Sequence, residues 1–534
     1  MINHILVSLA AVLLLATACT GDFYDKNTNP DEATDEMLDW DNLRVGASFS
    51  QLIKNVLPSY QLSGEEYGSN YFQTIQDLAG NAFAGYSGVT NSGINFNPTY
   101  RVSGATHHDN MFDSAYERAI GAWKRVDSER ENQPEAAAIA DIAKVAVMHR
   151  VTDTYGPIPY TNLASNEMTR PYDAQSKVYA AFFEELEAAI DLLYGFSGGS
   201  TSTAVLANFD DVLGGNVANW IRFANTLRLR LAMRVAYVDP QLARTQAEAA
   251  AAHPMGFITS TVQLNKPATG AWEYPMYKIQ YDFGDSAAGA TILAYMNGYN
   301  DPRRAFYFTR NADGDYHGVR SGLDLSQTSN SEYTGSNATL SKFNCTNNDP
   351  IVWAKPAEAY FLLAEGALRG WNMGGDAQSF YEQGIAQSFA TEGAGSADGY
   401  ISDSGSTPAP FTDKVNSANS ATAPSNITIA WNSGATFEQN LERIITQKYI
   451  AIFPDGQEAW SEFRRTGYPK VFPVIYNGNQ GQVSTQTQIR RLDFPSSEYS
   501  TNGANVQAAV STLNSESSSA SGDNGGTKLW WDKK

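Results

Sequence analysis

The chain has 534 residues, of which 42% are hydrophobic and 12% aromatic, so it is long and apolar enough to bury a substantial core. Its 37 Lys and Arg residues stand against 57 Asp and Glu residues, which gives a formal net charge of −20 at pH 7. So acidic a protein is unsuited to nucleic acid and to anionic lipid headgroups, and its charge favours a soluble body with neutral ligands.

The N-terminal segment has the features of a lipoprotein signal peptide. Residues 5–16 form an apolar run that is too short for a membrane-spanning helix, which needs ~20 apolar residues. Two small residues and then Cys19 follow this run, as at the cleavage site of a lipoprotein precursor. The only other cysteine is Cys345, so a chain acylated at Cys19 has no internal disulfide.

We therefore predict a signal peptide over residues 1–18 and a thioether-linked lipid on Cys19. Residues 19–35 are rich in Asp, Asn, Thr and Gly and lack apolar periodicity, which predicts a flexible tether. Ordinary secretion with an unmodified Cys19 is the alternative, because residues 1–4 contain no Lys or Arg and Ala16 stands where such signals usually have Leu.

Helices dominate the predicted structure of the remaining chain. The segments that predict them either repeat apolar residues at helical spacing or are rich in Ala. Pro240 ends one of them, because proline lacks the N–H that a helix interior needs. The six predicted helices cover residues 134–151, 175–194, 216–238, 356–369, 377–389 and 437–453.

Two of these helices, over 356–369 and 377–389, form a hairpin of about the size of a tetratricopeptide unit. No charged or Pro-rich linker divides the chain, so we predict a single, mainly α-helical domain over residues 36–534 with a few short strands. Unusually long loops rich in Gly, Asn, Ser and Thr decorate it, and loops of this length are usually functional or disordered. These loops cover residues 79–104, 195–207, 314–341 and 390–425.

Six segments along the chain carry a resemblance to the SusD/RagB family of nutrient-binding outer-membrane lipoproteins, and within it to the SusD-like branch. Each segment is longer and more distinctive than a generic short motif. The segments are 153–160 (DTYGPIPY), 354–365 (AKPAEAYFLLAE), 447–453 (QKYIAIF), 457–467 (QEAWSEFRRTG), 490–499 (RRLDFPSSEY) and 527–531 (TKLWW).

The resemblance implies a fold of tetratricopeptide-like helix pairs with loops and small strands packed against them. It also implies a location and a partner. The protein would be lipid-anchored in the outer membrane, face the cell exterior and cover a SusC-like TonB-dependent barrel. There it would capture an oligosaccharide, or in some members a peptide, and deliver it to the transporter.

Two clusters of aromatic residues outside regular helix spacing are candidate ligand sites. Neutral sugars are bound by aromatic rings that lie flat on the sugar and by amide and carboxylate groups that bond its hydroxyls. One cluster lies in the Gly/Ser-rich segment 83–96, and the other covers 272–283 and the aromatics that follow. Aromatics packed beneath the loops are the alternative for any single position. The candidate residues are Tyr86, Asn91, Trp272, Tyr274, Tyr277, Tyr281 and Tyr299.

The remaining signals predict no metal, no cofactor and no catalytic residue. His107, His108 and Asp109 have no third ligand at usable spacing, and the segment 311–315 lacks the glutamate that closes a calcium loop. We interpret both as surface turns. Glu, Trp and Arg side chains within 458–465 predict a buried ion pair with cation–π stacking, which is structural.

We therefore predict a glycan-binding lipoprotein that is not an enzyme. A peptide-binding member of the same family is the main alternative. A surface glycoside hydrolase is a further one, because a carboxylate pair ~5–10 Å apart cannot be detected in the sequence alone. A structural scaffold without a pocket is the last.

Overall fold

A computed structural model of the chain describes residues 42–58, 68–101, 108–165, 167, 169–268, 272–479 and 481–534. The predicted signal peptide, Cys19 and the predicted tether lie outside the described residues, and so does His107.

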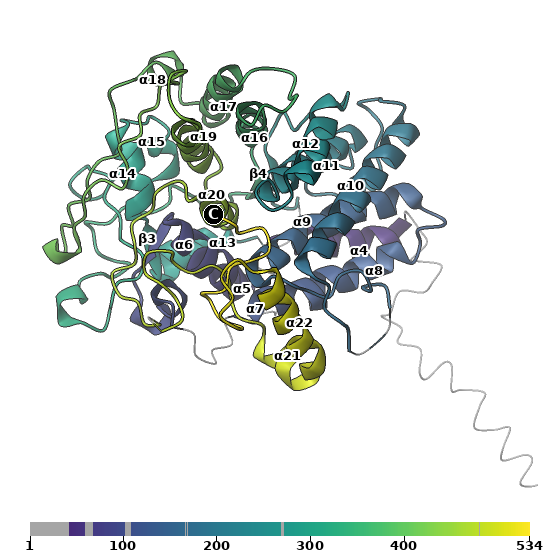
Figure 1. The fold of residues 1–534 in the computed structure, drawn as a ribbon, viewed down its shortest axis with the longest axis horizontal. Coiled ribbons are helices and arrows are strands. Elements are labelled where there is room, and N and C mark those ends of the chain that lie inside the picture. The colour runs from purple at the N-terminus through teal and green to yellow at the C-terminus, as the bar shows by residue number, and fades with distance from the viewer. Residues whose placement is uncertain are drawn as a thin grey trace, which may run out of the picture.

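The fold is mainly α-helical, as predicted, and consecutive helices pack side by side (Figure 1). The six helices that the sequence predicts are all present, with ends shifted by a few residues. The two helices predicted to form a hairpin, over 356–369 and 377–389, pack against each other. These helices are α9 (Pro134–Tyr155), α10 (Gln175–Ser197), α11 (Val217–Arg234), α16 (Ala357–Leu368), α17 (Ala377–Glu392) and α19 (Phe437–Ala451).

Helices outside these six ranges fill the spaces around this frame. Some lie within a predicted loop, since the segment 79–104 begins as π-helix and contains a short α-helix and a strand. The α-helices outside the six predicted ranges are α4 (Leu43–Ile53), α5 (Gly68–Phe72), α6 (Ala82–Ala84), α7 (Asn110–Asp113), α8 (Gly121–Asp127), α12 (Pro240–Ala252), α13 (Pro275–Tyr277), α14 (Ala290–Gly298), α15 (Arg304–Tyr307), α18 (Asp398–Ile401), α20 (Gly456–Thr466), α21 (Ser496–Thr501) and α22 (Gly503–Glu516).

A fully buried helix, α20, joins the parts of the fold. Its charged side chains form ion pairs with residues from α11, α16 and α19, and Asp153 of α9 pairs with Arg234 of α11. We call this group the central ion cluster. No member has a side chain more than 4% exposed. Each buried charge therefore interacts with an opposite charge in place of the water that it has lost. The cluster consists of Asp153, Arg230, Arg234, Glu358, Glu365, Lys448, Glu458, Glu462 and Arg465.

Cation–π stacking accompanies these ion pairs, as the sequence predicts. The Arg464 guanidinium carbon lies 3.4 Å from the centroid of the Trp460 ring, and both side chains are buried. Arg464 also donates hydrogen bonds to the Asp153 and Arg490 carbonyl oxygens, at 2.6 Å and 2.8 Å. The prediction that this motif is structural is therefore confirmed.

The described strands are short and form two antiparallel pairs. β2 (Val262–Leu264) pairs with β4 (Ile351–Ala354), and β1 (Ser87–Val89) pairs with β3 (Ser286–Ala288). The second pair matters for the site, because it joins the two segments that contain the predicted aromatic clusters. None of the helices within the described ranges combines the length and the apolar character that a membrane crossing needs.

Candidate functional site

The pairing of β1 with β3 brings two loops to one end of a small sheet. In the register of this pair, Val89 at the end of β1 lies opposite Ser286 at the start of β3. The next residue, Thr90, donates its backbone N–H to the Asp285 carbonyl oxygen at 2.9 Å and its hydroxyl to the Gly284 carbonyl oxygen at 2.8 Å. The loop after β1 and the turn before β3 are therefore held side by side.

A buried carboxylate fixes the predicted site residue Asn91 at this junction. The Asn91 amide donates to Oδ1 of Asp285 at 2.7 Å, and Gln73 donates to the other oxygen, Oδ2, at 2.7 Å. The side-chain oxygen of Asn91 accepts from the Gly93 N–H at 2.9 Å. Since these bonds fix the orientation of the side chain, Asn91 presents a fixed polar edge at the surface.

A third loop reaches the junction through a contact between two glycines. A Cβ atom on Gly335 would lie 2.1 Å from the Gly284 Cα, a distance that real Cβ atoms do not adopt. Gly284 itself has φ +68°, which favours glycine. The two backbones can approach this closely only because neither residue has a side chain.

The three loops enclose a cavity of about 580 Å³. Hydroxyl and amide groups form much of its wall, which suits a polar ligand with many hydroxyls. The lining residues are Thr90, Asn91, Ser92, Tyr281, Asp282, Phe283, Gly284, Leu325, Asn330, Ser331, Tyr333, Thr334, Gly335, Ser336 and Lys342.

Two tyrosines that the sequence predicts for the site stack at one side of this cavity. Tyr277 and Tyr281 are four residues apart on a helical segment, so their rings lie above one another, 4.8 Å between centroids and 11° from parallel. The Tyr281 hydroxyl donates to the Phe343 carbonyl oxygen at 2.7 Å. Lys342 Nζ lies 4.7 Å from the Tyr281 centroid, and since Tyr277 covers one face, the ammonium lies over the other.

The aromatic ring with free surface in the cavity is Phe283, which the sequence analysis did not select. Phe283 is 46% exposed, and Lys278 Nζ lies 5.5 Å from the centroid of its ring, whereas both faces of Tyr281 are occupied by neighbours. Phe283 is the last residue of the helical segment before Gly284, where the chain turns. An aromatic residue immediately before a helix-ending glycine is the sequence signal that could have found it.

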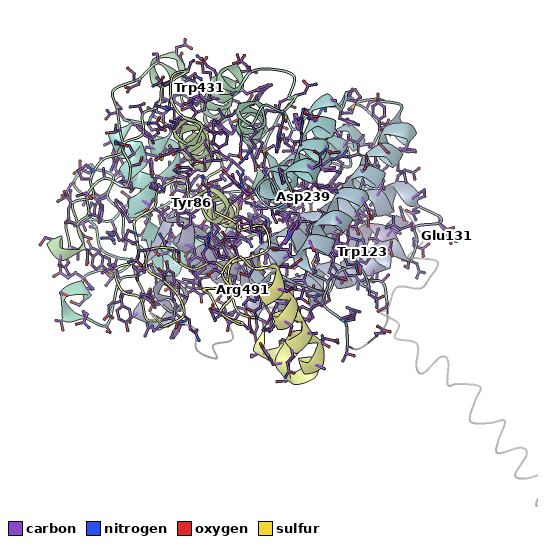
Figure 2. The ribbon with its side chains drawn as sticks, in the orientation of Figure 1. Tyr86, Trp123, Glu131, Asp239, Trp431 and Arg491 are labelled. Carbon is purple, nitrogen blue, oxygen red and sulfur yellow. The ribbon has the colours of Figure 1, made fainter. Side chains whose placement is uncertain are left out.

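The other candidate residues lie away from the cavity wall. Tyr86, labelled in Figure 2, is 0% exposed, and its hydroxyl donates to the Tyr449 carbonyl oxygen. Tyr274 and Tyr299 are 6% and 2% exposed. Trp272 is half-buried, and its ring N–H donates to the Asp349 carbonyl oxygen at 3.1 Å. Of the seven aromatic and amide candidates, the structure therefore brings Asn91, Tyr281 and Tyr277 together and packs the rest into the body.

Both segments that resemble metal sites have structural partners, and the first is not at the surface as predicted, since His108 and Asp109 are 7% and 8% exposed. His108 Nδ1 contacts Asp493, and its Nε2 lies 2.8 Å from the Asn97 side-chain oxygen. Asp109 accepts hydrogen bonds from the backbone and side chain of Ser496. In the segment 311–315, the two aspartates bind the Lys414 ammonium at 2.8 Å and 2.9 Å. The ammonium therefore occupies the position that a metal ion would take. Among the described residues, no group of three or more His, Cys, Asp and Glu side chains could hold a metal ion.

A family model described as SusD-like, the SusD and RagB outer-membrane lipoproteins, matches residues 25–532. The chain belongs to the SusD/RagB family. Among solved structures, a chitin-binding SusD homologue from Flavobacterium johnsoniae is 36% identical to this chain, with a TM-score of 0.84. The match covers 92% of this chain and 99% of the homologue.

Other SusD homologues have the same fold over the same extent. One from Bacteroides thetaiotaomicron is 36% identical with a TM-score of 0.81, and one from Bacteroides uniformis is 36% identical with a TM-score of 0.82. Each match covers 92% of this chain and 99% of the homologue. No curated protein matches the sequence. Family and fold are thus those that the sequence motifs predict.

Proposed function

We propose that this SusD-like protein is a glycan-binding lipoprotein of the cell surface, and that the three-loop cavity is its binding site. The observation that carries the proposal is the combination of one exposed aromatic ring, Phe283, with a wall of hydroxyl and amide groups. A ring of this kind packs against the C–H face of a sugar, and the polar wall bonds its hydroxyls. The chitin-binding homologue supports a glycan as the ligand.

The finer parts of the proposal concern anchoring and delivery. A lipid on Cys19 would hold the protein in the outer membrane, facing the exterior, and a SusC-like TonB-dependent barrel would receive the captured glycan. Family membership supports both. Intact-mass analysis of the membrane-extracted protein tests the anchor. We expect an N-terminal Cys19 that carries a diacylglyceryl group, and an unmodified Cys19 would exclude it.

Binding without catalysis is the activity that the cavity favours. Hydrolysis of a glycosidic bond ordinarily requires two carboxyl groups across the cleft. Asp282 is the one carboxylate among the lining residues that the structure describes, and it pairs with Lys278 at 3.2 Å. Burial raises the pKa of the nearby Cys345 thiol to about 12, so this thiol does not supply a nucleophile at neutral pH.

Calorimetric titration of the protein starting near Asp35 against purified oligosaccharides and peptides tests the proposal. We expect saturable binding to one class of glycan. Phe283→Ala should weaken that binding about fivefold, because about 1 kcal/mol of ring contact is lost. The measured quantity is the ratio of dissociation constants.

Phe306→Ala is the matched control. Phe306 is 45% exposed, nearly the same as Phe283, and it does not line the cavity. This variant should bind glycan as the unaltered protein does. Binding of peptides alone would transfer the function to the peptide-binding alternative, and turnover of any glycan during the titration would refute the claim that the protein is not an enzyme.

A further inference from the structure

Among the described residues that line the cavity, Lys342 is the one basic side chain, and none of the described carboxylates pairs with it. Its ammonium donates to the Gln280 carbonyl oxygen at 2.5 Å and lies over the Tyr281 ring. Within the described part of the chain, no carboxylate forms an ion pair with it. Two other buried lysines differ in this respect, since Lys355 and Lys448 each pair with a glutamate, at 2.5 Å and 2.9 Å.

Lys342 is half-buried and has no carboxylate partner, although the protein has a net charge of −20. Burial removes water from the charged group and lowers the pKa of Lys342, and no carboxylate compensates for the loss. The acidic residue among the described lining residues, Asp282, pairs with Lys278 at 3.2 Å. Lys278 also pairs with Glu273 at 3.2 Å, so both carboxylates form their ion pair with Lys278 and not with Lys342.

An anionic group on a ligand would supply the negative charge that the described side chains do not place beside Lys342. An ammonium has three N–H donors, and the Gln280 carbonyl uses one of them. A carboxylate or sulfate placed against the remaining donors would form charge-assisted hydrogen bonds, which are about twice as strong as neutral ones. The hydroxyl groups of Ser92 and Ser331 in the cavity wall are suited to the uncharged part of a sugar.

We propose that Lys342 makes the cavity selective for glycans that carry a negatively charged substituent, a carboxylate or a sulfate. The inference rests on the proposed glycan-binding function and adds the chemical class of the ligand. It assigns Phe283 to the apolar face of one sugar ring and Lys342 to the charged group. Because Lys342 is the one basic side chain among the described residues that line the cavity, we expect one charged group to be recognised there.

Matched pairs of oligosaccharides that differ only in this charge provide the test. One pair is an oligogalacturonate and its methyl ester, and another is a carrageenan oligosaccharide, whose only charged groups are sulfates, and its desulfated form. Uncharged chitin oligosaccharides complete the panel. For at least one pair, we expect the anionic member to bind at least tenfold more tightly than its uncharged partner. This advantage should shrink as ionic strength rises, because salt screens the attraction. The pair that binds distinguishes carboxylate from sulfate.

Three variants separate recognition of charge from a structural role of the lysine. Lys342→Met should abolish the preference for the anionic member, so that the two members of a pair bind alike. Lys342→Arg should retain the preference, since the charge stays in place. Lys266→Met is the control, because this exposed lysine bonds Asn348 at 2.8 Å and does not line the cavity.

Each remaining outcome overturns the inference. If only uncharged glycans bind, or if both members of every bound pair bind equally, the ligand class is wrong while the proposed function stands. If Lys342→Met weakens both members equally, the lysine only supports the Gln280 carbonyl. If no glycan binds at all, the proposed function fails together with the inference.

Discussion

Replacing Arg465 with methionine should lower the free energy of unfolding by about 3–5 kcal/mol, which is the typical effect of removing one partner from a buried ion pair. Arg465 is 0% exposed and donates to both oxygens of Glu365, at 2.7 Å and 2.6 Å. Its Nε also donates to Glu462 at 2.9 Å. Methionine fills a similar volume but leaves both carboxylates with fewer donors in the core. Urea unfolding at neutral pH, followed by circular dichroism, measures the change.

The choice of pH follows from the titration of Glu365. Burial raises the pKa of this carboxyl, but Arg465 and Arg369 outweigh burial and lower the pKa to about 2. Because the folded-state pKa lies below the unfolded value of 4.5, the ion pairs stabilise the protein fully above about pH 4.5. Their contribution is lost as pH falls toward 2. The effect of the substitution should therefore be complete at neutral pH and smaller in acid.

Arg244→Met is the matched control for this substitution. Arg244 lies on the surface of α12 and pairs with Glu248 four residues later, at 2.8 Å. Exposed pairs of this kind contribute little, so the unfolding transition should not move measurably. An equal loss of stability in both variants would mean that methionine itself, and not the broken buried pair, causes it. No loss in Arg465→Met would mean that apolar packing replaces the ion pair fully.

The helical frame could be predicted from the sequence because its signals are local. The apolar spacing that marks α10 and α11 arises within one helix, and so does the Pro that begins α9. The cation–π pair of Arg464 and Trp460 could be predicted for the same reason, since the two residues are four apart on α20. In each of these cases the partners are neighbours in the chain.

The cavity could be predicted only in part, because distant segments build it. Asn91 and Asp285 are separated by 194 residues and meet through β1 and β3, strands of three residues that are buried on both faces. Such strands lack the alternation that would reveal them in the sequence. Tyr86 and Tyr281 both occupy Gly- or polar-rich surroundings in the sequence, and only the tertiary structure buries the first and leaves the second at the cavity. Nothing local distinguishes Lys342 from an ordinary loop lysine.

Gly335→Ala should weaken glycan binding about thirtyfold, roughly 2 kcal/mol, because it separates two walls of the cavity. The added Cβ would lie 2.1 Å from the Gly284 Cα and 2.1 Å from its carbonyl oxygen, so one backbone must move. Movement of Gly284 shifts the adjoining Phe283 ring, and movement of Gly335 shifts the hydroxyls of Thr334 and Ser336. The effect should therefore exceed that of Phe283→Ala, which removes the ring alone. Calorimetry with the same glycan measures both.

Gly399→Ala shows whether the contact, and not the loss of a glycine, is responsible. Gly399 lies in α18, and a Cβ atom there would meet nothing within 4 Å, so this variant should bind normally. Neither glycine has a positive φ, which removes backbone strain as a difference between the two substitutions. Unchanged binding by Gly335→Ala would contradict the assignment, because a site between these loops cannot tolerate their separation. Loss of binding with an unchanged unfolding transition would place the ligand at the junction of the three loops.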